Sequence, residues 1–358
     1  MEIYFCQSRG WINSLLGDYS DQIRTSMEIR RAHNIWRIIR TSLRGVKSRG
    51  NPKKEIPSLT LAMTILSIST LLWATVSHST SLKFVDEVNR EVAVSFPPQR
   101  IVSLAPNITE ILFSLGLDKE IAGVSIHCNF PEKAKTKVQV GSYISLDFER
   151  IISLKPDLII ATGAGNTREM VERLEKLGFP TYVIFPKNFS DVLKSIGHLG
   201  QVVGREKEAK GIIQVMKQRS QRVIELTQDL SRPNVFLQIG EAPMITVGKG
   251  SFADDLITLA GGVNIAEKEK EMYPRWGMEE ILKRSPEVIL ISSMNPRGDY
   301  QRVLQEWSRW KMIPAVQNGR VHLIDSDLID RPSPRIIDGL EEMARILHPE
   351  RFKKIMQN

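Results

Sequence analysis

Residues 149–160 read ERIISLKPDLII, and residues 279–290 read EEILKRSPEVIL. Each stretch is typical of a short helix, a proline that stops it, an acidic residue, and an unbroken apolar strand of the kind buried in parallel sheets. The same unit therefore occurs once in each half of the chain. Two copies so far apart indicate two lobes of similar construction.

Strands and helices alternate around each copy of this unit. A hairpin is predicted over residues 83–95. Further strands are predicted at 100–104, 121–124, 157–161, 181–185, 234–239, 288–292 and 321–324. Helices are predicted from a cap at Asn107 or Thr109 to 115, and at 147–154, 167–177, 190–203, 254–260, 278–283 and 334–347. This order predicts parallel sheets with helices on both faces.

One segment interrupts the alternation. Residues 206–230 are predicted to form a single helix, which at 1.5 Å per residue is roughly 37 Å long. A helix of that length spans two lobes instead of packing on one. The predicted fold is therefore α/β, with two doubly wound βα lobes joined by one long backbone helix and a ligand cleft between them. The predicted boundaries are 83–203 for the N-terminal lobe, 204–232 for the linking helix and 233–358 for the C-terminal lobe.

A charge-free apolar run, residues 56–76, precedes the lobes and follows several lysines and arginines. A basic region, an apolar core and small residues are typical of a secretory signal, and the length also suits a membrane anchor. Residues 56–81 are therefore predicted to be a signal peptide or anchor. No cysteine lies near the end of this segment, so a lipoprotein attachment site is not expected. Residues 1–55 are interpreted as a short cytoplasmic segment or the result of an early start codon.

The net charge of +8 is unevenly distributed. Residues 1–55 carry eleven Lys and Arg against five Asp and Glu, and the other 303 residues carry 38 against 36. The basic excess lies before the apolar run, as expected for a segment that faces the cytoplasm. The lobes lack the basic surface that nucleic-acid binding needs, so that function is excluded.

Two glycine-rich segments favour a nucleotide-binding enzyme as an alternative function. Gly163-Ala164-Gly165 follows a predicted strand and opens a helix, as half of a dinucleotide fingerprint would, but Arg168 occupies the third glycine position. Residues 248–251 (GKGS) resemble the end of a phosphate loop but lack its remaining residues. The simpler interpretation of the first segment is a helix N-terminus that faces a cleft, and that of the second is a turn before the helix that starts at Asp254.

The residues that metal sites and catalysis need are sparse. His127 and Cys128 are neighbours without further ligands at metal-site spacing, and the other cysteine, Cys6, lies beyond the apolar run. Cys128 is expected to pack as a small apolar residue. No nucleophile and base occur at the spacing of a known catalytic family. The chain is therefore predicted to be a binding protein without enzymatic activity and without a cofactor.

Residues 83–355 resemble the helical-backbone class (class III) of periplasmic substrate-binding proteins, which serve ABC importers of cobalamin, ferric siderophores and haem. The resemblance is carried by residues 100–110 (RIVSLAPNITE), the two repeated units and residues 331–336 (RPSPRI). The last stretch, with Asp327 before it, is most similar to the cobalamin-binding branch. The resemblance implies an extracytoplasmic receptor that delivers a corrinoid to a permease and its ATPase. A ferric-siderophore or haem receptor of the same class is the alternative.

The resemblance also implies roles for particular residues. A corrin ring is a flat apolar plate edged with amides, so its receptor needs aromatic faces and polar groups at the rim. Tyr143 is expected at one aromatic contact and Tyr273 or Trp276 at another. Asp327 and Arg331 are expected to contact ligand amides or phosphate. The remaining candidate ligand contacts, each near the start of a helix, are Pro106 and Asn166.

An acidic residue on each lobe of this class is thought to meet arginines of the permease. Glu279 matches that position in the C-terminal lobe, and Glu169 is the candidate in the N-terminal lobe. Both acids are also expected to stabilise the helices on which they lie. The receptor is expected to be a monomer. A membrane-anchored sensor with residues 1–55 as its output segment is a further alternative.

Overall fold

The computed structural model describes residues 80–293 and 296–356. The chain divides into two compact units, Met1–Ser77 and His78–Asn358, and the described residues all belong to the second unit. The predicted segment 1–55 and all but the last two residues of the predicted segment 56–81 lie outside the described residues; residues 80 and 81 begin strand β1. Within the described ranges, no helix is long and apolar enough to cross a membrane.

The N-terminal lobe contains a five-stranded sheet in the order β5-β4-β3-β8-β9, with every neighbouring pair parallel. Its strands are β3 (Ile101–Ser103), β4 (Ile121–Val124), β5 (Val138–Gln139), β8 (Leu158–Thr162) and β9 (Thr181–Ile184). Its helices are α3 (Pro106–Ser114), a 3-10 turn (Glu132–Thr136), α4 (Phe148–Leu154), α5 (Arg168–Lys176) and α6 (Phe189–Val202). Two antiparallel hairpins complete the lobe: β1 (Thr80–Val85) with β2 (Glu91–Phe96), and β6 (Gly141–Ser142) with β7 (Ser145–Leu146).

The C-terminal lobe contains the second five-stranded sheet, in the order β11-β10-β13-β14, with β12 also paired to β10. Only the pairing of β10 with β11 is antiparallel in this described sheet. Its strands are β10 (Asn234–Glu241), β11 (Met244–Thr246), β12 (Val263–Asn264), β13 (Val288–Ser293) and β14 (Val321–Asp325). Its helices are α8 (Phe252–Leu259), α9 (Met278–Arg284), α10 (Pro296–Trp307), α11 (Pro314–Gln317), α12 (Ser326–Ile329), α13 (Ile336–Leu347) and α14 (Pro349–Met356).

Side chains alternate across both sheets, as the pleat of a strand requires. On β8, Leu158 and Ile160 belong to one buried apolar cluster, and Ile159 and Ala161 belong to another. Strand β13 divides its apolar side chains between two clusters in the same way. Each sheet is therefore covered by helices on both faces, and the predicted doubly wound architecture is confirmed.

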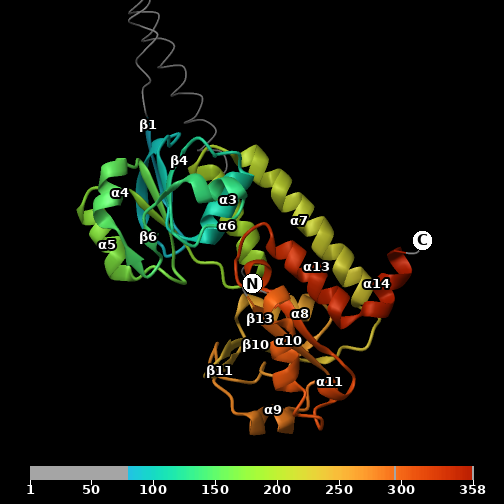
Figure 1. Ribbon diagram of the computed structural model, residues 1–358. Helices are drawn as coiled ribbons and strands as arrows, with labels where there is room; N and C mark the ends of the chain where they lie inside the picture. The colour runs from blue at the N-terminus through green and yellow to red at the C-terminus, as the bar shows by residue number, and fades with distance from the viewer. Residues whose placement is uncertain (1–79, 294–295, 357–358) are drawn as a thin grey trace, which may run out of the picture. The chain divides into compact units, whose positions relative to one another are not determined.

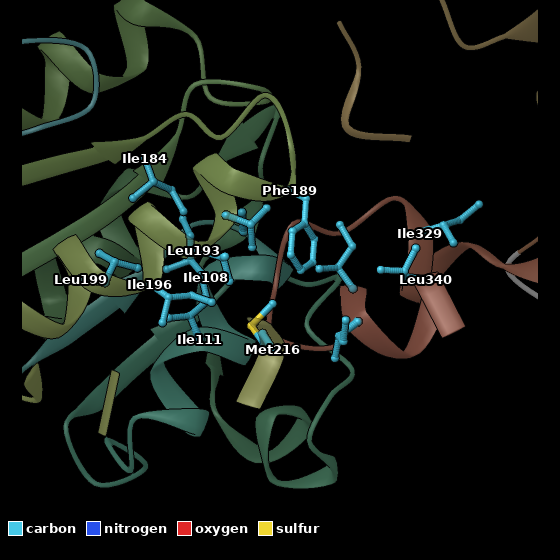
Figure 2. Close-up of a cluster of buried hydrophobic side chains, with 14 of the residues drawn as sticks. Ile108, Ile111, Ile184, Phe189, Leu193, Ile196, Leu199, Met216, Ile329 and Leu340 are labelled. Carbon is cyan, nitrogen blue, oxygen red and sulfur yellow. The ribbon is translucent and has the colours of Figure 1, made fainter. Parts of the chain in front are cut away.

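A single helix, α7 (Glu206–Thr227, 22 residues), connects the two lobes (Figure 1). It packs against α6 on one side and against α13 on the other. One apolar cluster accordingly continues from Ile108 and Phe189 through Met216 to Leu340 (Figure 2). The predicted linking helix is confirmed, although it ends three residues earlier than expected.

The two copies of the repeated unit adopt the same local structure. Helices α4 and α9 both end in a left-handed residue, Lys155 (φ 47°) and Ser285 (φ 46°), immediately before the proline. The acidic residue after each proline caps the neighbouring central strand. Asp157 accepts hydrogen bonds from the backbone N–H groups of residues 99 and 100 (2.7 and 2.9 Å), and Glu287 accepts one from Asn234 (2.8 Å).

Several element boundaries differ from the prediction. Helix α3 begins at Pro106, not after a cap at Asn107 or Thr109, because proline lacks an N–H and its fixed φ suits the first helical position. Helix α13 begins at Ile336 instead of residue 334. Helix α10 was not predicted, because its first residues include Pro296 and Gly298, which are typical of a turn.

Candidate functional site

Most of the predicted ligand contacts follow the carboxyl ends of parallel strands, where α/β proteins commonly bind ligands. Pro106 follows β3 at the first position of α3 and is half-buried. Asn166 follows β8, and Asp327 follows β14 as part of the short helix α12. The sheet topology therefore places residues from both lobes at equivalent strand ends.

Asn166 holds the loop that carries Tyr143. Its amide oxygen accepts a hydrogen bond from the Thr162 N–H (2.9 Å), and its amide nitrogen donates to the Tyr143 carbonyl (2.9 Å). Asn166 is buried, so both ends of its amide are used inside the protein. The structure thus gives Asn166 a supporting position behind Tyr143.

Tyr143 presents an exposed ring on the N-terminal lobe. The centroid of this ring lies 5.7 Å from that of His127, which is also exposed. A Cβ atom built on Gly165 would lie 2.8 Å from Cδ2 of Tyr143. The ring therefore rests directly on the backbone at residue 165, which only glycine leaves free.

The two aromatic candidates of the C-terminal lobe occupy different environments. Trp276 is 9% exposed and stacks on Phe236, with ring centroids 5.9 Å apart and an interplanar angle of 11°. The Arg284 guanidinium lies 4.8 Å from the centroid of its ring. Tyr273, by contrast, is 49% exposed. Of this pair, only Tyr273 offers substantial free surface to a ligand, and Trp276 is a core residue.

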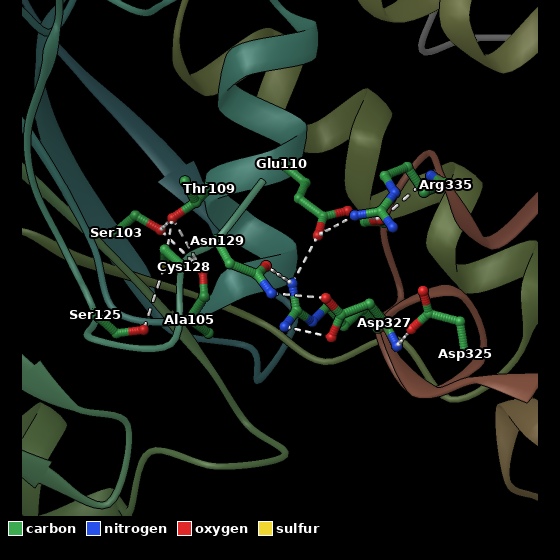
Figure 3. A network of polar contacts seen from close by, with 12 residues as sticks. Ser103, Ala105, Thr109, Glu110, Ser125, Cys128, Asn129, Asp325, Asp327 and Arg335 are labelled. Carbon is green, nitrogen blue, oxygen red and sulfur yellow. Dashed lines mark hydrogen bonds and ion pairs between the residues drawn. The ribbon is translucent and has the colours of Figure 1, made fainter. Parts of the chain in front are cut away.

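Arg331 is the centre of a polar network that joins the two lobes. Figure 3 shows its partners Glu110, Asn129 and Asp327. Its Nη2 donates to Oδ1 of Asp327 (2.5 Å), within the C-terminal lobe. Its Nη1 donates to Oε1 of Glu110 (3.0 Å) and Oδ1 of Asn129 (2.6 Å), both in the N-terminal lobe. Asn129 in turn donates to Oδ2 of Asp327 (2.8 Å). Both terminal nitrogens of Arg331 are therefore engaged by protein groups.

Asp330 lies next to this network and is accessible to solvent. Burial among surrounding protein atoms nevertheless raises the pKa of its carboxyl to about 6, against the opposing effect of the hydrogen bond from Ser292 (2.6 Å). The negative charge of Asp327 raises this pKa further.

Tyr273 lies close enough to Asp330 to interact with its charge. Burial raises the pKa of its hydroxyl, and the negative charge of Asp330 raises it further. On the other lobe, His127 and Asn129 lie on one loop and connect Tyr143 to Asp327. We call Asn129, Tyr143, Tyr273, Asp327 and Asp330 the inter-lobe site. Sequence reasoning missed Asn129 and Asp330, although Asp330 lies between two predicted contacts.

The two acids predicted to meet a permease are both exposed. Glu169 and Glu279 each occupy the second position of a helix, α5 and α9 respectively. Hydrogen bonds from its own backbone N–H and from Thr167 hold the pKa of Glu169 below its usual range. The repeated unit, however, makes Glu149 the counterpart of Glu279, because Glu149 is exposed at the second position of α4. Sequence reasoning missed Glu149, although the repeat contains it.

The remaining motifs have structural explanations. Cys128 is buried, as predicted, and its sulfur lies 3.1 Å from the Thr109 hydroxyl and 3.2 Å from that of Ser125 (Figure 3). Across the part of the chain that the structure describes, no group of three or more His, Cys, Asp or Glu side chains could hold a metal ion. A recess of about 830 Å³ between α6 and α7 is lined by none of the predicted contacts.

Comparisons with known proteins agree with this architecture. A family model described as "Periplasmic binding protein" matches residues 101–328. The vitamin B12-binding protein of Vibrio campbellii is 32% identical over 259 residues, which cover 72% of this chain and 92% of that protein. An ABC transporter substrate-binding lipoprotein of Bacillus subtilis, YvrC, is 30% identical over 276 residues, or 75% of this chain and 86% of that protein.

Solved structures show the same fold. The crystal structure of the periplasmic vitamin B12-binding protein of Vibrio cholerae matches with a TM-score of 0.64 and 30% identity, covering 70% of this chain and 97% of that one. A periplasmic haem-binding protein of Roseiflexus matches with the same TM-score of 0.64 at 22% identity, covering 71% and 99%. The second likeness concerns the fold alone.

Proposed function

Because the chain belongs to the periplasmic binding protein family, we propose that its two lobes capture cobalamin or a related corrinoid at the inter-lobe site and deliver it to an ABC importer. The receptor is extracytoplasmic, like the family to which it belongs. Relatives named as vitamin B12-binding proteins support this choice of ligand. The proposal includes no catalytic step.

The observation that carries the proposal is the chemistry of the inter-lobe site. Tyr143 on one lobe and Tyr273 on the other are exposed aromatic rings near a pair of carboxylates, Asp327 and Asp330. Aromatic faces suit the flat apolar corrin ring, and carboxylates accept hydrogen bonds from the amides at its edge.

The same site is less suited to the alternative ligands. Haem carries two propionates, and many ferric siderophores are anionic, so their receptors need free cations. The guanidinium nearest the carboxylates, that of Arg331, already serves Glu110, Asn129 and Asp327. An amide-rich ligand therefore fits better than a carboxylate-rich one.

A calorimetric titration of the purified protein with cyanocobalamin, haemin and a ferric catecholate siderophore tests the proposal. We expect one corrinoid to bind per chain, tighter than the other two ligands, and to be recovered unchanged. Absence of corrinoid binding would overturn the ligand assignment. Binding of haemin or the siderophore in its place would move the protein to the corresponding branch of the family.

Delivery to a permease requires a docking surface on each lobe. Glu279 offers an exposed carboxylate at the start of α9, and the repeat offers Glu149 as its equivalent on the N-terminal lobe. Glu169 is a competing candidate on that lobe. We propose that one acid from each lobe pairs with cationic residues of the permease.

A further inference from the structure

Glu110 is a buried acidic residue that the proposed ligand contacts do not include. It lies on α3 of the N-terminal lobe and is 2% exposed. Its carboxylate accepts a hydrogen bond from the Ser333 hydroxyl at 2.6 Å and ion-pairs with Arg331 and Arg335 at 3.0 and 3.4 Å (Figure 3). All three partners belong to one segment of the C-terminal lobe, residues 331–335, more than 220 positions away.

Removing the partners of Glu110 while the carboxylate stays buried should cost substantial free energy. Burial raises the pKa of Glu110, and the Ser333 hydroxyl and the two guanidinium groups oppose that rise. A buried carboxylate that loses such partners is left desolvated and unpaired, so the two sides of the contact are strongly dependent on each other. The desolvation of buried charges offsets much of their attraction, so such a cluster is weak evidence of added stability.

The segment that Glu110 holds also positions one edge of the inter-lobe site. Arg331 links Glu110 directly to Asp327. The Arg335 guanidinium lies 4.0 Å from the ring centroid of Phe130, next to Asn129 on the N-terminal lobe. Glu110 and the loop at residues 129–130 thus both contact segment 331–335 from the N-terminal lobe, and this loop also contacts Asp327.

We propose that Glu110 is an inter-lobe positioning residue, which presents no atom to the ligand but holds Asp327 and Asp330 opposite Tyr143 through its contacts with Arg331, Ser333 and Arg335. The expected effect of Glu110 on ligand binding rests on the proposed function. The structural part of the inference, a restrained separation of the two lobes, holds for any ligand.

The test compares Glu110→Gln with Glu341→Gln. Both substitutions neutralise a glutamate that forms ion pairs with two arginines. Glu341 pairs with Arg219 and Arg345, away from the inter-lobe site, so its substitution is the matched control. Spin labels at Lys176→Cys and Gln305→Cys, on exposed positions of α5 and α10, report the distance between the lobes without ligand. Cys6→Ser in the same background prevents unwanted labelling.

We expect Glu110→Gln to broaden the inter-lobe distance distribution and to weaken cyanocobalamin binding on the order of tenfold, as coupled residues of one network do. Glu341→Gln should change neither quantity. Combining Glu110→Gln with Asp327→Asn should weaken binding less than the product of the single effects, which a purely structural role of Glu110 does not predict. Ser333→Ala keeps all charges. It should also broaden the distance distribution and weaken cyanocobalamin binding several-fold, and it replaces Glu110→Gln in the test if that variant does not fold.

An unchanged distance distribution in both Glu110→Gln and Ser333→Ala would overturn the inference. So would an additive effect of the double variant on affinity. Failure of the wild-type protein to bind a corrinoid would instead overturn the proposed function, and the distance measurement would still decide the role of Glu110.

Discussion

Replacing Trp276 with alanine should destabilise the C-terminal lobe. The indole is buried against Phe236 and covered by the Arg284 guanidinium, so its removal leaves a cavity in the apolar cluster of that lobe. Substitutions of this kind cost about 3–5 kcal/mol, of which the aromatic stacking is only a part. Affinity for the ligand, measured where the variant is still folded, should change little.

Replacing Tyr273 with alanine should have the opposite effect. The side chain is 49% exposed, so the loss of stability should stay below about 1 kcal/mol. A tyrosine offers 150–250 Å², so roughly half of this area, on the order of 100 Å², is free for a ligand. At about 25 cal/mol per Å², covering that area contributes about 2.5 kcal/mol, or about 60-fold in Kd.

Urea unfolding and calorimetric titration of the two variants test this reasoning together. The expected pattern is a large stability loss with retained affinity for Trp276→Ala, and a small stability loss with weakened binding for Tyr273→Ala. If Trp276→Ala unfolded like the wild type, the burial of its ring would not contribute as calculated. If Tyr273→Ala bound cyanocobalamin normally, the aromatic contact of the C-terminal lobe would have to lie elsewhere.

Three further predictions follow from the site. Gly165→Ala should displace the Tyr143 ring, because the new Cβ would lie 2.8 Å from it, and should weaken ligand binding several-fold. Gly211→Ala in α7, where the new Cβ would meet nothing within 4 Å, should leave the affinity unchanged. Equal affinities of the two variants would show that the Tyr143 ring adapts freely. The pKa of Asp330 is raised to about 6, so its contribution to stability is complete below the ordinary value of 3.8 and is lost as the pH rises through about 6. Asp330→Asn should remove that dependence of the unfolding free energy between about pH 4 and 6, and an unaltered slope in urea unfolding would contradict the assignment. Glu279→Lys and Glu149→Lys should each abolish permease-dependent uptake and leave ligand affinity intact, because a reversed charge repels cationic residues of the permease. Loss of uptake in Glu169→Lys but not in Glu149→Lys would favour Glu169 as the docking residue of the N-terminal lobe.

The fold was predictable from local sequence because its decisive features are local. The stretches ERIISLKPDLII and EEILKRSPEVIL each combine a helix, a stop and a buried strand within twelve residues. The proline and the left-handed residue before it act on their immediate neighbours only. The 22-residue helix α7 was predictable for the same reason, since no strand or breaker interrupts it. The start of α10 was missed because packing of its later residues, Val303 and Trp307, outweighs an opening typical of a turn.

The candidate site was predictable only in part, because burial and partners depend on contacts between distant segments. Sequence reasoning could not distinguish Tyr273 from Trp276, since both are aromatic residues of one loop and only the packing on Phe236 separates them. It could not predict that Arg331 pairs with Glu110, because this acid lies 221 positions away in the sequence. No local pattern contains that information.

The repeated unit shows how the two kinds of information combine. In each copy the acid after the proline, Asp157 or Glu287, accepts hydrogen bonds from backbone N–H groups next to a central strand. The acid near the helix start, Glu149 or Glu279, is exposed in both lobes. The first pair of acids is explained by the fold, because each satisfies backbone N–H groups at the start of a neighbouring strand. The second pair satisfies no such requirement beyond favouring its own helix starts. A pair of exposed carboxylates that recurs at equivalent points of two lobes is therefore the surface feature best suited to a partner that contacts both lobes at once.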